Sequence, residues 1–339
     1  MPQGRGILGR MRGRSLAAVL VAAVLVVVVL AVAGCSVISV DLTPRVRPLE
    51  EKTVEGHGRD KILLMEVSGF ISDDASPSGL SLTAAPPRVP LLVRVREELK
   101  KASEDDKIKA MVLRINSPGG TVTASDIIFR EIQLFQRRTE IPIVAVMMDV
   151  AASGAYYIAL AADTIVAHPT TVTGSIGVIM VTANAEGLMQ KLGLAANTIK
   201  SGEHKDMGSP FRALTPQERG IFQAIIDDLQ RQFVSKVAER RKMPLETAQK
   251  LADGRVYTAE QALANRLVDR VGYLPDAIDV AKKAAGIDEA RVVIYRRPHQ
   301  YRATYFAQAE TPPSGIETSL AGVATLSGLG PRFLYLWLP

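Results

Sequence analysis

The sequence is poor in the residues that build disulfides and metal centres. It has one cysteine and four histidines in 339 residues, and the histidines stand apart at positions 57, 168, 204 and 299. A single cysteine excludes a disulfide scaffold, a cysteine-based zinc site and an iron–sulfur cluster. No two histidines have the spacing of ligands on one helix face. We therefore expect no metal site.

Acidic residues are absent from the first 15 positions, which contain four arginines. Without those four, the remainder holds 37 basic and 35 acidic residues, a net charge of +2. The overall excess of +6 is therefore no argument for a nucleic-acid partner, which would need a basic face on the folded domain. With 47% apolar and 22% charged residues the composition is globular, which excludes a wholly disordered chain.

One long run lacks polar side chains altogether. Leu16–Ala33 contains only leucine, alanine and valine, and as a helix it would be roughly 27 Å long, close to the thickness of the bilayer core. The preceding arginines predict a cytoplasmic N-terminus and an extracytoplasmic remainder. Residues 16–34 are then either a retained transmembrane anchor or a lipoprotein signal segment, because the run closes on a Val-Ala-Gly-Cys sequence that resembles a lipobox. Cys35 would be the lipidated residue.

The rest of the chain divides into three parts by composition. Prolines, glycines and mixed charges predict a linker from the membrane, and a tail with an apolar end follows the folded domain. We expect that end to dock on a neighbouring subunit or on the membrane surface, because exposed aromatic clusters are uncommon on soluble monomers. The predicted segments are a basic n-region at 1–15, the membrane segment at 16–34, the linker at 35–58, the folded domain at 59–296 and the tail at 297–339.

Hydrophobic periodicity predicts an α/β fold, with a mainly parallel sheet flanked by helices. Buried strands are expected at 61–67, 110–115, 143–148 and 164–167, with shorter ones near 177–181, 197–200 and 291–295. Helices are expected at 91–102, 123–138, 153–162, 216–241, 244–252, 259–265 and 274–285. Pro216 stands in the first turn of the longest helix, where its missing N–H costs nothing.

Two glycine-bearing turns follow successive predicted strands, and each opens a helix. They are Asn116–Gly120 and the turn around Ser153. Turns at the carboxyl ends of parallel strands are where open α/β sheets place their sites. Small neighbours would let a carbonyl group approach the Ser153 hydroxyl. A serine nucleophile needs a base, and spacing alone leaves His204 and Lys205 as alternatives in the same polar loop.

Four motifs in order resemble the signal peptide peptidase A family. They are Asn116-Ser-Pro-Gly-Gly120, Asp149-Val-Ala-Ala-Ser-Gly-Ala-Tyr-Tyr157, Thr173-Gly-Ser-Ile-Gly-Val178 and Ser201-Gly-Glu-His-Lys-Asp206. The segment Ala252–Tyr257 adds to the similarity, which covers roughly residues 61–295. The resemblance implies the fold shared by Clp protease and crotonase, and a serine–lysine dyad.

Carried over position by position, the resemblance implies Ser153 as the nucleophile and Lys205 as the general base. Ser175 would orient the lysine amine. The backbone N–H groups of Gly120 and Gly154 would form the oxyanion hole. No cofactor is implied, and the family's fold implies a homo-oligomeric ring. A lysine base must be neutral, so Glu203 and Asp206 are expected to point away from Lys205.

The expected activity is that of a serine endopeptidase at the bacterial cytoplasmic membrane, with its catalytic domain outside. Its expected substrates are signal peptide remnants and other hydrophobic unfolded segments, held in a pocket of small and aliphatic side chains. Two alternatives stay open: a related protease acting on a stomatin-like membrane partner, and a lipoprotein that binds peptides without cutting them. A crotonase-type enzyme is disfavoured because an export signal removes the chain from the coenzyme A pool.

Overall fold

The computed structural model describes residues 48–73, 89–297 and 333–338. The predicted membrane segment 16–34, Cys35 and most of the linker 35–58 lie outside these residues. Within the described part of the chain, no helix is long and apolar enough to cross a membrane. Membrane attachment through residues 16–34 therefore stays a prediction.

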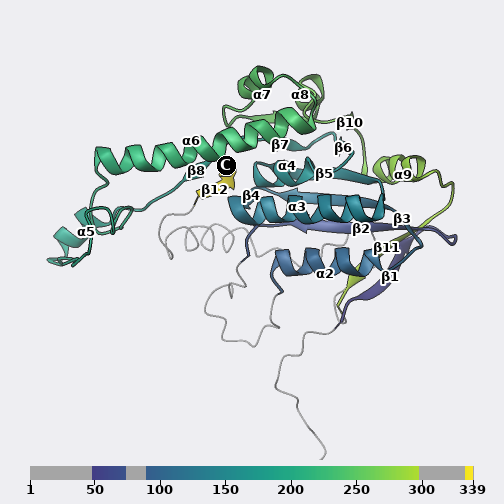
Figure 1. The fold of residues 1–339 in the computed structure, drawn as a ribbon, viewed down its shortest axis with the longest axis horizontal. Coiled ribbons are helices and arrows are strands. Elements are labelled where there is room, and N and C mark those ends of the chain that lie inside the picture. Colours follow the sequence, from purple (N-terminus) through teal and green to yellow (C-terminus); the bar gives the residue numbers. More distant parts are fainter. Residues whose placement is uncertain (1–47, 74–88, 298–332, 339) are drawn as a thin grey trace, which may run out of the picture. The chain divides into compact units, whose positions relative to one another are not determined.

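The centre of the fold is a nine-stranded, mainly parallel sheet (Figure 1). Its main path runs β1-β11-β2-β3-β5-β6-β10, and β7 and β9 continue from the end of β5. Only β1 and β9 pair antiparallel with their neighbours. The strands are β1 (Glu50–Glu55), β2 (Lys61–Ser68), β3 (Ile108–Ser117), β5 (Ile143–Ala152), β6 (Thr164–Ala167), β7 (Val172–Gly174), β9 (Val256–Thr258), β10 (Arg270–Val271) and β11 (Arg291–Arg296). The predicted mainly parallel sheet is confirmed.

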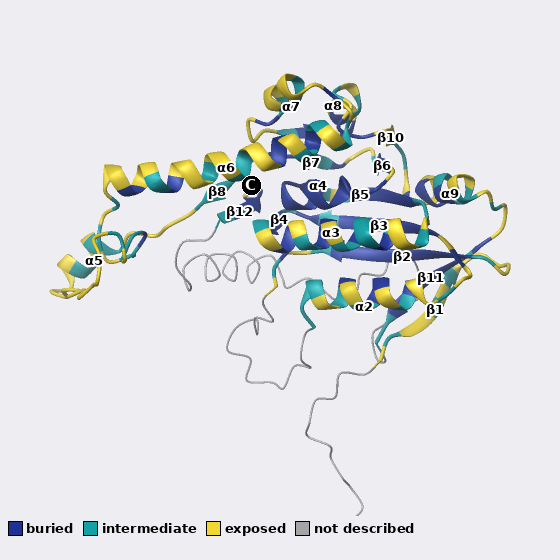
Figure 2. Ribbon diagram, viewed as in Figure 1, coloured by how far each residue is buried: buried dark blue, intermediate teal, exposed yellow. Residues whose placement is uncertain are grey.

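Helices cover both faces of this sheet, which explains why its central strands are apolar on both sides (Figure 2). Alternate residues of β2 face opposite ways, so Leu63 and Met65 enter one cluster while Ile62 and Leu64 enter another. The first cluster packs against α2 (Leu91–Ser103), α3 (Val122–Thr139) and α4 (Gly154–Ala159). The second packs against α9 (Leu274–Ala285). The site described below therefore rests on a rigid, doubly covered sheet.

The longest helix, α6 (Pro216–Arg240), begins as its sequence predicts. Pro216 occupies the first turn, and Thr215 and Glu218 form a reciprocal capping box. Its second half packs onto the domain through Phe233, Val234 and other buried residues, whereas its first turns lead out to α5 (Glu186–Lys191) (Figure 1). The short helices α7 (Leu245–Leu251) and α8 (Ala259–Ala264) follow.

A second, three-stranded sheet joins distant parts of the chain. Its order is β4 (Gly119–Thr121), β12 (Phe333–Leu336) and β8 (Ile179–Met180), with β12 antiparallel to both neighbours. The apolar end of the tail was expected to dock on another subunit or on the membrane. That prediction is wrong for residues 333–336, because they pair with strands of their own domain.

Two further segments differ from the prediction. Glu50–Glu55, within the predicted linker, forms β1 and pairs with β11 at the edge of the sheet. Residues 197–200 form no strand, and Ile199 is fully exposed without a neighbouring strand to pair with.

Candidate active site

The two predicted turns lie side by side, because β3 and β5 are adjacent parallel strands. Asn116 joins them, since its side-chain oxygen accepts the Val150 N–H at 3.1 Å. The Ser117 hydroxyl donates to the Gly69 carbonyl at 2.6 Å and accepts the Gly119 N–H at 3.0 Å. The polar side chains of Asn116 and Ser117 thus hold the Asn-Ser-Pro-Gly-Gly turn in place by hydrogen bonds. The carboxyl edge of the sheet holds the candidate site, as parallel topology predicts.

Ser153 stands at the junction between β5 and α4 in a strained backbone conformation. Its φ is 54° and its ψ is −114°, on the side of φ space that favours glycine. Such a residue costs on the order of 1–3 kcal/mol and persists only where its surroundings hold it. Here the Ser153 N–H donates to Gly174 O at 2.7 Å, and its Oγ lies 3.5 Å from Gly177 O. A sharp strand-to-helix turn that presents a strained serine is typical of a nucleophile.

The strain predicts an unusual effect on stability. We expect Ser153→Gly to unfold at a higher temperature than Ser153→Ala, because glycine adopts a positive φ without penalty while alanine retains the strain. The expected difference is about 1 kcal/mol, or about 2–4 °C for a domain of this size. Differential scanning calorimetry of both variants measures it. Equal melting temperatures would show that Ser153 is not strained.

The glycines predicted to form the oxyanion hole are packed against one another. A Cβ on Gly120 would lie 1.9 Å from Ile71 O, and a Cβ on Gly154 would lie 2.4 Å from Ser125 Oγ and 3.3 Å from the Gly120 nitrogen. Neither position admits a side chain. The structure therefore brings Gly120 and Gly154 together directly beside Ser153.

Ser175 also lies in this region. It follows Gly174, the residue that accepts the Ser153 N–H, and it is buried with a φ of 47°. Its own N–H donates to Arg255 O at 2.8 Å, within the Ala252–Tyr257 segment noted from the sequence. Ser153, Ser175, Gly120 and Gly154 are thus close neighbours, although they come from three separate stretches of sequence.

Lys205 is not brought to Ser153 within one chain. It lies in an exposed segment that we call the arm, residues 181–215, which runs from β8 through α5 to the beginning of α6 (Figure 1). The arm is tied to the first turns of α6, because Arg212 binds Glu218 at 2.5 Å and Asp206 at 2.7 Å. In Figure 1 this end of α6 lies well away from α4.

The carboxylate of Asp206, the residue after Lys205, forms ion pairs with other side chains. Asp206 binds Lys200 and Arg212, each at 2.7 Å. The hydrogen bonds from Arg212 lower the pKa of the neighbouring Glu218 to about 2, so this anchor of the arm stays charged at any pH well above that value. The carboxylate of Asp206 therefore pairs with Lys200 and Arg212, as the expectation that it points away from Lys205 requires.

Neither His168 nor His204, the histidine that the sequence left as an alternative base, is in contact with Ser153. The His168 ring contacts Thr170 and stacks edge-on against Tyr273, and His204 lies in the arm, 3.4 Å from Gln217.

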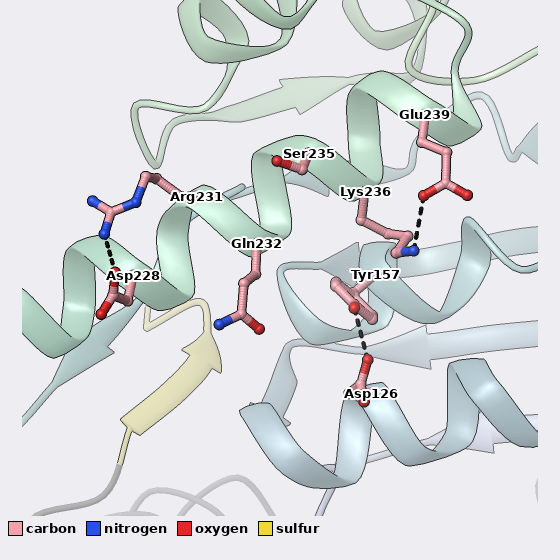
Figure 3. Close-up of a pocket in the computed structure, with 8 residues that line it drawn as sticks. All are labelled: Asp126, Tyr157, Asp228, Arg231, Gln232, Ser235, Lys236 and Glu239. Atoms are coloured by element: carbon pink, nitrogen blue, oxygen red, sulfur yellow. Dashed lines mark hydrogen bonds and ion pairs between the residues drawn. The ribbon is translucent and has the colours of Figure 1, made fainter.

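A hollow of about 520 Å³ lies beside α3 and α6 (Figure 3). Polar and charged side chains line most of it, and Ser153 is not among them. Tyr157 of α4 forms one wall, where its hydroxyl donates to Asp126 at 2.8 Å. Burial and this hydrogen bond raise the pKa of Tyr157 well above its usual value, so the phenol stays neutral. Tyr157 therefore adjoins both the hollow and the candidate site, because its N–H donates to Ser153 O at 2.9 Å.

Comparison with known proteins identifies the family to which the chain belongs. The model of peptidase family S49 matches residues 135–288. An Enterococcus faecium protein named "Putative signal peptide peptidase SppA" is 38% identical over 247 residues, which cover 73% of this chain and 70% of that protein. The chloroplastic serine protease SPPA of Arabidopsis thaliana is 36% identical over 277 residues, covering 80% of this chain and 39% of the relative.

Two other similarities are more limited in extent. Protease 4 of Salmonella typhi is 37% identical over 199 residues, covering 59% of this chain and 32% of that protein. Among solved structures, a ClpP1 variant from Listeria monocytogenes is 17% identical with a TM-score of 0.40, covering 63% of this chain and 94% of the other. Taken with the strained serine and the four motifs, the extended match to the Enterococcus protein shows that this chain belongs to peptidase family S49 and is a serine peptidase of the signal peptide peptidase A family.

Proposed function

We propose that the protein is a membrane-anchored serine endopeptidase that cleaves hydrophobic extended segments, such as signal peptide remnants, outside the cytoplasmic membrane. The observation that carries the proposal is Ser153, held at a positive φ beside two glycines whose positions exclude side chains. In this mechanism the Ser153 hydroxyl attacks a peptide carbonyl, and the N–H groups of Gly120 and Gly154 stabilise the developing oxyanion. The Clp protease/crotonase fold is part of the same proposal.

Lys205 is the proposed base, and a second copy of the chain supplies it. The buried contacts of α6 with the domain begin at Phe222, whose ring centroid lies 6.2 Å from that of Phe333, and the arm is tied to the helix N-terminal to that contact, at Glu218. Within one chain the base is therefore separated from Ser153. A neighbouring arm would instead bring Lys205 to Ser153, which is buried in the single chain.

The surface of the arm fits a protein partner. Six large apolar side chains on it are exposed. They are Val181 (37%), Leu188 (61%), Leu192 (63%), Leu194 (57%), Ile199 (101%) and Phe211 (51%). Because exposed apolar patches of this kind mark interaction sites, and because the site is incomplete without Lys205, the proposed occupant is a second copy. Repetition of such a head-to-tail contact closes a ring.

The membrane attachment of the domain is proposed from the sequence alone. Residues 16–34 would hold the domain at the membrane, either as a helix or, after processing, through lipid on Cys35. Both positions lie outside the described residues. Intact-mass analysis of the membrane-extracted protein distinguishes the two, because only a lipoprotein starts at Cys35.

Labelling with a serine-directed fluorophosphonate tests the proposed nucleophile. We expect the full-length protein to be labelled on Ser153 and to hydrolyse a hydrophobic signal-like peptide, since both reactions need the same activated hydroxyl. The Ser153→Ala variant should do neither, while the Ser175→Ala variant should keep labelling at a reduced rate. Peptide binding without labelling or turnover would instead favour the non-catalytic alternative.

A further inference from the structure

The loop at the end of β7 holds Ser153 from two directions. We call it the support loop, Gly174–Gly177. Gly174 O accepts the Ser153 N–H at 2.7 Å, and Gly177 O lies 3.5 Å from Ser153 Oγ. The backbone position and the hydroxyl direction of Ser153 therefore both depend on where this loop lies. Because a displacement of about 1 Å at a reacting group can cost about a hundredfold in rate, the position of the loop matters for catalysis.

The support loop has a backbone shape that its surroundings must hold. Gly174 has a φ of 85° and Ser175 a φ of 47°, and for serine this left-handed conformation is strained. Such a conformation persists only where neighbouring groups impose it. One of these groups lies behind the loop, where Arg255 O accepts the Ser175 N–H at 2.8 Å. The support loop thus depends on residues 252–255 for its position.

A side chain of α6 joins the support loop to the segment behind it. The Nε2 of Gln230 donates to Ala252 O at 2.8 Å and reaches Ile176 O at 3.5 Å. One carboxamide therefore meets both the support loop and residues 252–255. Because both partners are carbonyl oxygens, only the NH2 end of the amide can face them, which fixes the orientation of the side chain. Among the described residues of α6, Gln230 is the one whose side chain hydrogen-bonds the support loop.

The other end of the Gln230 amide has no partner. Its Oε1 is buried and accepts no hydrogen bond within the described part of the chain. A buried acceptor without a partner is unfavourable, and an apolar side chain of similar length would avoid that cost. Val234, one helical turn further along the same face of α6, is such an apolar contact with the core. The carboxamide at position 230 is therefore explained by what its NH2 group holds and not by packing.

We propose that Gln230 is a positioning residue for the serine nucleophile. By fixing the support loop against residues 252–255, it sets the direction of the Ser153 hydroxyl, and it acts through the loop rather than on the reacting atoms. The same helix is tied to the arm through the ion pair between Arg212 and Glu218. One helix therefore carries the proposed base and also supports the nucleophile of its own chain. This inference rests on the proposed function, because it takes Ser153 as the nucleophile.

Replacement of Gln230 by methionine tests the proposal in the full-length protein. Methionine has nearly the length of glutamine and fills irregular spaces, but it has no donor. We expect Gln230→Met to lower the rate constant of fluorophosphonate labelling at Ser153 about tenfold, because the hydroxyl is no longer held in position. The kcat for a hydrophobic signal-like peptide should fall by the same factor while KM stays within about twofold, since attack is affected and peptide binding is not. Gln232→Met is the matched control, an exposed glutamine of the same helix, and it should change neither value.

The rate constant of labelling separates this role from a general effect on stability. Loss of folded protein lowers the amplitude of labelling but leaves the rate constant of the remaining sites unchanged. A second variant without the donor, Gln230→Leu, should label as slowly as Gln230→Met. Labelling of both variants at the rate of the parent would overturn the proposal, and so would an equal loss in Gln232→Met or a rise in KM with kcat unchanged. Failure of the parent protein to label on Ser153 would instead refute the proposed function, and this inference with it.

Discussion

Two inactive variants of this protein should restore each other. We expect Ser153→Ala and Lys205→Ala each to lose about 10³-fold or more in kcat/KM, because nucleophile and base act as a unit. Co-expressed in one oligomer, they should regain activity, because a Lys205→Ala chain still carries Ser153 and can receive Lys205 from a Ser153→Ala neighbour. Random assembly of equal amounts gives about one quarter of the sites both residues, since each site draws its serine and its lysine from different copies.

The measurement uses two affinity tags and tandem purification, so that only mixed oligomers are assayed. His204→Ala is the matched control in the same loop, and it should keep most of its activity because His204 lies next to Gln217 in the arm. If the mixed oligomers are as inactive as the single variants, the base does not come from a neighbour. If His204→Ala is inactive and Lys205→Ala is active, the serine–lysine assignment is wrong.

Much of the fold could be predicted because its elements carry strong local patterns. The strands β2, β3 and β5 each contain an uninterrupted run of at least four apolar residues, as expected of strands covered on both faces, and α3 and α9 have clear apolar stripes. β1 lacked that signal. It is an edge strand with four charged residues in six, so its sequence resembles a linker, and only pairing with β11 gives it structure.

The candidate site likewise has features that the sequence predicts and features that it does not. Glycine-bearing turns after parallel strands predict where the serine and the glycines lie, because topology alone brings those strand ends together. The positive φ of Ser153 leaves no trace in the sequence, since any residue type can stand in a strained turn that its neighbours hold. The position of β12 could not be predicted from the sequence either. β12 is separated along the chain from its partner strands by more than 150 residues for β8 and more than 210 for β4. Its four apolar residues predict that the strand is buried, but they do not indicate which strands it pairs with.

A side chain at Gly120 should impair catalysis, because this tightly packed residue is also a proposed oxyanion donor. Gly120→Ala should lower kcat about 10²–10³-fold, the effect of losing one oxyanion donor. The physical reason is steric. A Cβ at this position would lie 1.9 Å from Ile71 O and within 2.6 Å of the Ile71 backbone nitrogen, and backbone atoms cannot rotate away as a side chain can. The loop must move, and the Gly120 N–H moves with it.

The loss should appear in kcat for peptide hydrolysis, because the oxyanion forms only after attack by Ser153. Gly220→Ala provides the matched control, since a Cβ there meets nothing within 4 Å on an exposed turn of α6 and should leave kcat unchanged. Circular dichroism and melting temperature establish that the Gly120→Ala protein is folded when it is assayed. A folded Gly120→Ala protein with the kcat of the parent would remove Gly120 from the oxyanion hole.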